Sequence, residues 1–220
     1  MTKSTGRYKP RDKEETRQML ITAVGDIIRE SGYKGLGVNK VAIRAGVHKK
    51  NIYNIFGTYN NLLRTYIRSK DFWTPVFEKF HLSDSPVGND VQEYIRNIFQ
   101  EQFKYFFSEK EMQSFIHWQV SEPNSLLRQI SEEREAQGAE IAAFTTDHFK
   151  GTGVSMRSVL ALILGGIYYV VWHADKNKSV VCGLDINDEK QREELIETIG
   201  MVIDWTWEAA ARKKSEKNGA

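Results

Sequence analysis

Apolar residues recur every three or four positions along most of the chain, which is the spacing of the buried face of an amphipathic helix. The first such segment runs from Lys13 to Ser31, and Gly32 can adopt the left-handed conformation that ends a helix. No run alternates with period two for long enough to predict a sheet. The same spacing predicts further helices over residues 38–45, 52–56, 62–73, 91–107, 112–120, 126–149, 156–174 and 188–212. We therefore expect an all-α protein.

Two local signals refine the predicted helix ends. Pro75 is expected to kink or end the helix over residues 62–73, because proline lacks a backbone N–H and clashes with the preceding turn. Ser108 and Glu111 have the spacing of a capping box, which predicts that they open the helix over residues 112–120.

Composition limits the class of protein. The chain has 220 residues, 40% of them hydrophobic, which is enough to bury a core and excludes a disordered protein. The longest apolar stretch, Val159 to Val171, is shorter than the ~20 residues that a bilayer span needs. Residues 1–13 lack the apolar segment of a secretion signal, and Cys182, the sole cysteine, excludes an internal disulfide. We expect a soluble, cytoplasmic protein with no membrane partner.

Charge is distributed unevenly between the two ends of the chain. Residues 1–70 contain 15 Lys or Arg and five Asp or Glu, a net charge of +10. Residues 71–220 contain the other 16 and 24, a net charge of −8. A compact basic segment attracts phosphates, but part of the excess lies between Lys3 and Lys13, where a solvated tail would explain it. Charge alone does not decide whether the N-terminal third binds nucleic acid.

The segment from Val38 to Phe56 has the spacing of a helix-turn-helix motif. Ala42, Gly46 and Ile52 supply its small crossing residue, its turn glycine and its apolar anchor. A helical hairpin inside a core would use the same residues, but it would not explain a polar cluster on the second helix. The cluster consists of His48, Lys49, Lys50, Asn51 and Asn54. Because Lys can bind guanine and Asn can pair bidentately with adenine in the major groove, the cluster predicts DNA binding.

Residues 16–63 resemble the DNA-binding domain of the TetR family of bacterial transcriptional regulators. The resemblance rests on Gly32, Val41-Ala42, Ala45-Gly46-Val47, Tyr53, Phe56 and Leu62-Leu63. Gly37 stands where the family commonly has a capping threonine, and Tyr59 where it commonly has a lysine. Gly37 can cap a helix without a hydroxyl, and Tyr59 can bind a phosphate without a charge. The resemblance places Lys40, Arg44, His48, Lys49, Lys50, Asn51, Tyr53, Asn54 and Tyr59 at the DNA.

The resemblance also implies an N-terminal three-helix helix-turn-helix domain joined to a larger helical ligand-binding and dimerisation domain. We expect the DNA-binding domain over residues 1–58, with a basic tail over 1–12, and a connecting helix over 59–80. The effector-binding and dimerisation domain should cover residues 81–212, followed by a disordered tail over 213–220. The stretch from His81 to Asp90 contains Ser, Pro and Gly and indicates a linker.

A dimer follows from the small size of the predicted reading unit. One such unit contacts only a few base pairs, so selectivity requires two copies ~34–36 Å apart on a near-palindromic operator. The last two helices are the expected homodimer interface, because small residues on one and an apolar stripe on the other would permit close packing. The predicted interface residues are Ala161, Gly165, Leu195, Ile199, Val202 and Thr206.

Aromatic residues are frequent in the second half of the chain. By the resemblance they would enclose a small apolar or aromatic effector, whose binding releases a repressor from double-stranded DNA. The candidate lining residues are Phe99, Phe103, His117, Trp118, Tyr168 and Trp172. Each of them also has an interpretation as an ordinary core residue, because aromatics at helical spacing are usually core.

Two other classes stay open at this stage: a helical enzyme of unknown reaction and a nonspecific architectural DNA-binding protein. The histidines are widely separated and never spaced to aim two rings at one metal, and no glycine loop is suited to phosphate. We therefore predict no catalytic residue, no metal and no cofactor. Tighter binding to one operator than to random duplex would favour a regulator over an architectural protein.

Overall fold

The computed structural model describes residues 13–82 and 89–218. Within these residues the chain forms eleven α-helices and one short 3₁₀ helix, and it contains no β-strand. The all-α prediction is confirmed. The predicted basic tail over residues 1–12 and the middle of the predicted linker, residues 83–88, lie outside the described residues.

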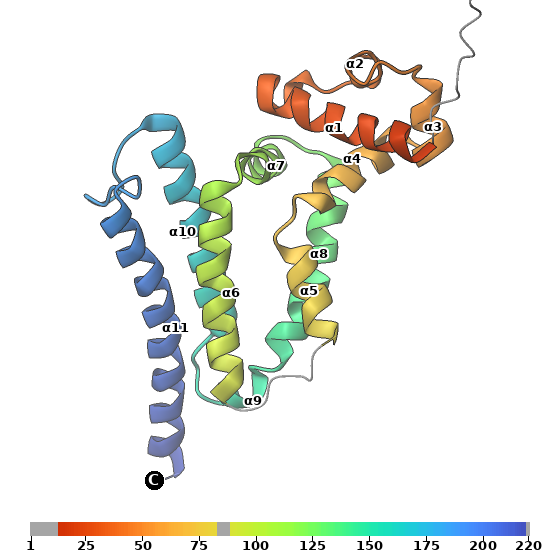
Figure 1. The fold of residues 1–220 in the computed structure, drawn as a ribbon. Helices are drawn as coiled ribbons and strands as arrows, with labels where there is room; N and C mark the ends of the chain where they lie inside the picture. The colour runs from red at the N-terminus through yellow and green to blue at the C-terminus, as the bar shows by residue number, and fades with distance from the viewer. Residues whose placement is uncertain (1–12, 83–88, 219–220) are drawn as a thin grey trace, which may run out of the picture.

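The N-terminal elements form a compact unit that we call the head (Figure 1). Its elements are α1 (Lys13–Ser31), η1 (Tyr33–Gly35), α2 (Val38–Arg44), α3 (Lys50–Phe56) and α4 (Tyr59–Ser69). Helix α1 contacts the other three helices and buries its apolar face, including Leu20 and Val24, against them. Gly25 permits α1 to approach α4 closely, because a Cβ there would lie 2.4 Å from the hydroxyl oxygen of Tyr66.

The remaining helices form a second unit that we call the body. They are α5 (Trp73–Leu82), α6 (Asn89–Ser108), α7 (Lys110–Ser121), α8 (Ser125–Ala143), α9 (Thr146–Phe149), α10 (Met156–Asn177) and α11 (Glu189–Asn218). Helix α6 packs against α10 and α11, and α5 packs against α8 (Figure 1). Phe103, Phe106 and Ile203 are fully buried in the core of the body.

The head and the body share part of one hydrophobic core. The cluster that contains Leu20 and Ile52 of the head also contains Phe115 and Trp118 of α7 and Leu127 of α8. Helices α1 and α4 both contact the body, α1 through α7 and α4 through α8. The head is therefore fixed to the body by packing as well as by the chain.

The predicted connecting helix over residues 59–80 is two helices. Helix α4 ends at Ser69 and α5 begins at Trp73. Pro75 lies in the first turn of α5, where its missing N–H costs nothing because the first four N–H groups of a helix have no intrahelical acceptor. The prediction that Pro75 kinks or ends a helix is wrong.

Two further boundaries differ from the prediction. The helix predicted over residues 126–149 is divided into α8 and α9. Helix α11 continues to Asn218, so the disordered tail predicted over 213–220 is helical through residue 218. Lys214 and Lys217 hold this last part of α11 by donating to the backbone carbonyls of Asp147 and Gly151.

The capping box predicted for the start of α7 does not form. Glu109 is the N-cap residue and makes no side-chain cap. The Ser108 hydroxyl donates instead to the carbonyl of Tyr105 at 3.0 Å. Glu111 is turned towards Arg29 and Lys70, so a tertiary contact replaces the local one that the sequence pattern predicts.

Candidate nucleic-acid interface and ligand cavity

The turn between α2 and α3 is built around Gly46, whose φ of 63° lies in the left-handed region that favours glycine. The N–H of Val47 donates to the carbonyl of Ala42 at 3.0 Å, which fixes the chain as it leaves the turn. Ile52 is 0% exposed and anchors α3 in the head core. One face of α3 is thus buried, and this burial determines which residues of the helix face outward.

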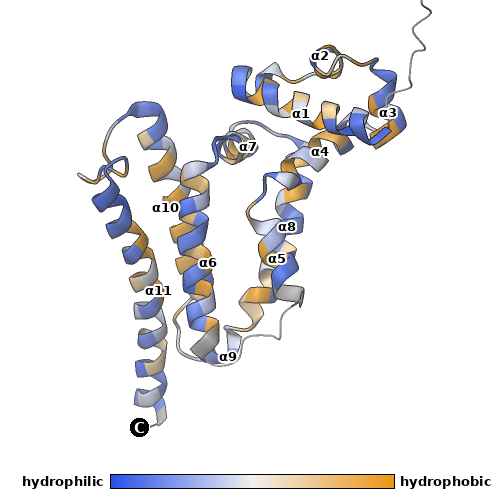
Figure 2. Cartoon of the chain, in the orientation of Figure 1, coloured by the Kyte–Doolittle hydropathy of each residue, from blue (hydrophilic) through white to orange (hydrophobic). Residues whose placement is uncertain are grey.

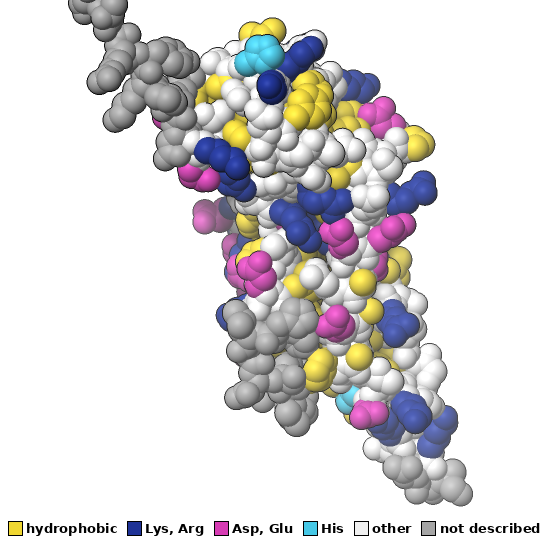
Figure 3. Space-filling model, turned by 90° about the vertical axis from the view of Figure 1, so that its right-hand side faces the viewer, with side chains coloured by type: hydrophobic (Ala, Val, Ile, Leu, Met, Phe, Trp, Pro, Cys, Tyr) yellow, Lys and Arg dark blue, Asp and Glu magenta, His cyan; other side chains and the backbone are white. Residues whose placement is uncertain are grey.

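The other face of α3 is polar and open to solvent. Its exposed residues, with those just before the helix, are His48, Lys49, Lys50, Tyr53 and Asn54, while Asn51 is half-buried. Nδ1 of His48 accepts the backbone N–H of Lys50 at 3.1 Å, so the neutral ring presents Nε2–H as a donor. Figure 3 shows Lys and Arg side chains on the head end of the molecule. This face offers several donors to a ligand that approaches the head.

Two predicted contacts from α2 differ in their surroundings. Lys40 is exposed. Arg44 forms a two-pronged ion pair with Glu30 of α1, in which Nη1 lies 2.7 Å from Oε1. To contact a phosphate, Arg44 would have to break its ion pair with Glu30 or bind the phosphate and Glu30 together.

The structure contradicts the role predicted for Tyr59. Its hydroxyl oxygen is buried, close to the backbone of Gly37, and does not face outward with the α3 cluster. Burial raises the pKa of Tyr59 to about 12. The ring packs against the head core, so the hydroxyl is not placed to bind a phosphate. Gly37 is the N-cap of α2 and makes no side-chain cap, as expected of glycine.

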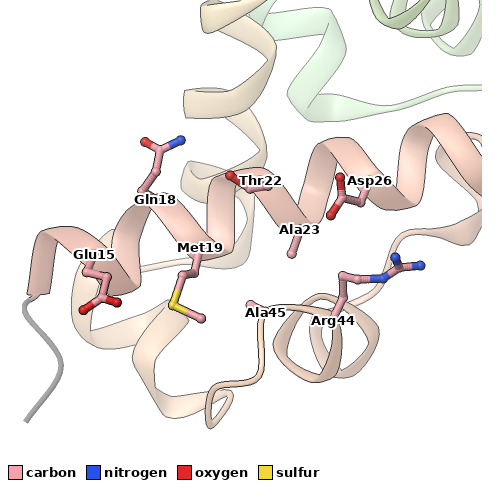
Figure 4. Close-up of a pocket in the computed structure, with 8 residues that line it drawn as sticks. All are labelled: Glu15, Gln18, Met19, Thr22, Ala23, Asp26, Arg44 and Ala45. Carbon is pink, nitrogen blue, oxygen red and sulfur yellow. The ribbon is translucent and has the colours of Figure 1, made fainter.

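A shallow hollow of about 500 Å³ lies between α1 and α2 (Figure 4). Asp26 and Arg44 lie on the same side of it, and Glu15 lies at the other end. Two of its three charged side chains are acidic, which does not suit a phosphate. The hollow is separate from the polar face of α3.

The junction of head and body contains a buried carboxylate that the sequence did not reveal as important. Glu111 of α7 is 6% exposed and pairs with Arg29 of α1 and with Lys70, whose Nζ lies 2.9 Å from Oε2. Burial raises the pKa of Glu111, but the hydrogen bonds from Lys70, Arg29 and Tyr66 outweigh it and hold the pKa below its ordinary value. Helices α1 and α7 and the C-terminal end of α4 therefore meet at one charged group. The sequence did not indicate this role of Glu111, because its partner Arg29 lies 82 residues away along the chain.

A cavity of about 410 Å³ lies between α5, α6, α7, α8 and α10. This volume falls in the range of small-molecule sites. Of the six predicted effector residues, Phe99 and Tyr168 line it. Trp73 and Phe77 of α5 also line it, although they are not among the residues predicted from the sequence.

The other four predicted effector residues lie elsewhere. Phe103 is fully buried in the body core. His117 and Trp172 line a second, mixed-polarity groove of about 640 Å³ between the head and α7 and α10. Trp118 stacks on Tyr33 of the head, with ring centroids 5.0 Å apart. These four residues therefore do not line the apolar cavity, and their assignment to an effector site stays a prediction.

The predicted dimer residues divide into exposed and buried sets. Ala161 and Gly165 are exposed on α10, and Leu195 and Val202 are half-buried on α11. Ile199 and Thr206 are buried within the chain, in the part of α11 that packs on α6, so they are not available to a partner.

Large apolar side chains outside the six predicted interface residues are also exposed on the same two helices. Leu162 and Tyr169 of α10 are 76% and 58% exposed, and Trp205 of α11 is 56% exposed. Helix α10 is long and apolar enough to cross a membrane by length and composition, and hydrophobic residues are visible on the part of it that α6 does not hide in Figure 2. Only 17% of that stretch is buried inside the chain, and one face of the helix, which includes Ala161, Leu162, Gly165 and Tyr169, is exposed.

The described residues contain no group of three or more His, Cys, Asp or Glu side chains that could hold a metal ion. What they do contain is a helix-turn-helix head with an exposed polar helix, packed on a helical body with an apolar cavity. These features define an all-helical architecture in which a helix-turn-helix unit is joined to a larger helical unit with a cavity.

The particular fold is that of the TetR-family transcription regulators. The chain is similar to the regulator FadR from Bacillus subtilis in complex with stearoyl-CoA, with 19% identity over 87% of this chain and 98% of that one, and a TM-score of 0.57. FadR from Bacillus halodurans gives 18% identity, 84% and 96% coverage, and a TM-score of 0.57. A TetR family transcription regulator from Marinobacter aquaeolei VT8 gives 17% identity, 89% and 95% coverage, and a TM-score of 0.55. No protein-family model matches the sequence, and no curated protein matches it.

Proposed function

We propose that the protein is a sequence-specific DNA-binding transcriptional regulator, a repressor that an effector releases from its operator. The observation that carries the proposal is the geometry of α3. Ile52 anchors one face of this helix, while Lys49, Lys50, Tyr53 and Asn54 are exposed on and beside the other. A helix of this kind, held by a helix-turn-helix, suits the major groove of DNA. The similarity of fold to known regulators supports the same function.

We propose that the regulator acts as a homodimer through α10 and α11. The exposed apolar side chains Leu162, Tyr169 and Trp205 would then be covered by the same helices of a second copy. A Cβ built at Gly165 or Gly166 would meet nothing within 4 Å in the chain, so both glycines face open space. Because they have no side chain, an α10 helix of a second copy would be able to approach closely there. Two heads in one dimer would read the two halves of a near-palindromic operator. This arrangement also accounts for an apolar α10 without a membrane.

We propose that the effector binds in the cavity between α5, α6, α7, α8 and α10. Its walls include Trp73, Phe77 and Phe99, which suit a ligand with a large apolar part. The Bacillus subtilis regulator of the same fold holds stearoyl-CoA, which supports an apolar chain as part of the effector. Binding there would act on α5, which follows α4 of the head directly, so the effector would change the position of the heads.

The test is a selection of bound duplexes from a random pool with the full-length protein at physiological salt. We expect enrichment of one near-palindromic sequence, bound at least ~10³-fold more tightly than random duplex. Equal binding to all duplexes, with a steep dependence on salt, would contradict the proposal and favour an architectural protein. The absence of any DNA binding would reject both functions.

A further inference from the structure

The apolar cavity is lined by hydrogen-bond donors as well as by hydrophobic side chains. Arg134 of α8 and Tyr168 of α10 both line it, next to apolar side chains such as Phe77 and Leu164. Arg157 and Glu135 are exposed residues that also line it. A largely buried guanidinium and a hydroxyl beside apolar walls are costly unless their donors have acceptors.

Arg134 uses only part of its donor capacity on the protein. Its Nε lies 3.2 Å from Oδ2 of Asp71, and its Nη2 lies 2.9 Å from Oδ1. Both side chains are largely buried. A guanidinium has five N–H donors, and this pairing uses one edge. Among the described residues, Nη1 of Arg134 has no hydrogen-bond or ion-pair partner, so a second edge is available to a ligand.

Tyr168 is held as a donor by its neighbours. Its hydroxyl oxygen accepts from Nε2 of Gln102 at 3.4 Å, and the indole N–H of Trp73 is also directed at it. As oriented in the structure, both neighbours present N–H groups to this oxygen, so neither accepts the hydroxyl proton. Burial raises the pKa of Tyr168 to about 12, so the group keeps its proton at neutral pH. Its O–H is therefore free to donate into the cavity.

We propose that the cavity binds an amphipathic carboxylate. The carboxylate accepts hydrogen bonds from the free edge of Arg134 and from the hydroxyl of Tyr168, and the hydrocarbon or aromatic part lies against the apolar walls. Charge-assisted pairing with a guanidinium explains why an anionic head is preferred over a neutral alcohol. The inference rests on the proposed function, because it names the ligand class of the same cavity.

Asp71 competes with such a ligand for Arg134. It lies in the break between α4 and α5 and also accepts the hydroxyl of Thr74 at 3.0 Å. A ligand carboxylate that draws Arg134 towards itself weakens the ion pair between Arg134 and Asp71. Because Asp71 lies between α4 and α5, this loosens the segment that joins the head to the body. In the structure, Asp71 thus occupies one edge of the Arg134 guanidinium that would bind the ligand.

The test measures ligand binding to the full-length protein without DNA, by calorimetry. The probes are octanoate, decanoate, dodecanoate and naphthoate, each compared with its matching alcohol below the concentration at which it forms micelles. In the wild type we expect at least one carboxylate to bind ~10-fold or more tightly than its alcohol. Asp71→Asn should bind that carboxylate more tightly, because Arg134 is no longer shared.

Two variants then remove the donors. The double variant Asp71→Asn/Arg134→Gln keeps the buried pair neutral and should lose the preference for carboxylate over alcohol. Tyr168→Phe keeps the ring and should bind the carboxylate several-fold more weakly. Arg128→Gln, an exposed change on the same helix, is the matched control and should leave the preference unchanged.

The proposal is overturned if no carboxylate binds, if the alcohols bind equally well, or if the double variant retains the preference. Because no DNA is present, these results do not depend on the duplex selection. Failure of the selection with carboxylate binding intact would overturn the proposed function and leave the ligand class in place.

Discussion

Asp175 of α10 is a carboxylate whose ionisation contributes to the fold. Its Oδ1 lies 2.7 Å from Nζ of Lys110 on α7, and its Oδ2 lies 2.9 Å from Nζ of Lys176. Burial raises the pKa of Asp175, but the hydrogen bonds from the two lysines outweigh it and hold the pKa at about 2. Because this lies below the value of ~3.9 in an unfolded chain, ionised Asp175 stabilises the fold above pH ~4. That contribution is lost as the pH falls towards ~2.

Asp175→Asn should therefore lower the free energy of unfolding by up to ~2 kcal/mol at pH 7. The difference between the variant and the wild type should shrink as the pH is lowered through the range between ~4 and ~2. Urea unfolding at several pH values measures it, with the exposed change Glu208→Gln as control. A difference that stays constant over this range would show that Asp175 acts through packing and not through its charge.

Individual side chains show where prediction from sequence stops. The exposure of Lys49, Lys50 and Asn54 was predictable, because they flank the anchor Ile52 on a short helix of known period. The orientation of Tyr59 was not, because its hydroxyl is buried by packing between α4 and the turn before α2. Glu111 had the spacing of a cap, but Arg29, 82 residues away, offers it a charged partner.

Helix positions were predictable to within a few residues, because apolar residues on one face must be buried wherever the helix lies. The break between α4 and α5 was not predictable, since it is held by the pair of Asp71 with Arg134, 63 residues along the chain. Residue pattern also failed to separate the two faces of α11. Ile199 and Trp205 are both apolar, but one packs inside the chain and the other is exposed.

The exposed faces of α10 and α11 lead to a prediction about assembly. Leu162→Glu or Trp205→Glu should convert a dimer to a monomer, because a charge would be placed inside an apolar interface. Multi-angle light scattering at micromolar concentration measures the mass. Val120→Glu is the matched control, because Val120 is 65% exposed but lies on α7. A wild-type monomer, or variants that stay dimeric, would place the interface elsewhere.

At the scale of the whole molecule, several contacts join the head to the body. The shared core, the ion pairs of Glu111 and the break at Asp71 all link helices of the body to α1 or α4 of the head. The resemblance of residues 16–63 predicted a head on a ligand-binding body. It did not predict which residues form the cavity, because the cavity is made where five helices of the body meet.

The central claim is that the exposed face of α3 reads the bases of DNA. Its most direct test is the ratio of the dissociation constants for the selected operator and for a scrambled duplex, measured at one salt concentration. For Lys49→Ala/Asn54→Ala the account predicts that affinity for the operator falls by ~10²-fold or more and that the ratio approaches one. Lys190→Ala, an exposed change on α11, should leave both constants unchanged. A double variant that still prefers the operator as strongly as the wild type would contradict the account.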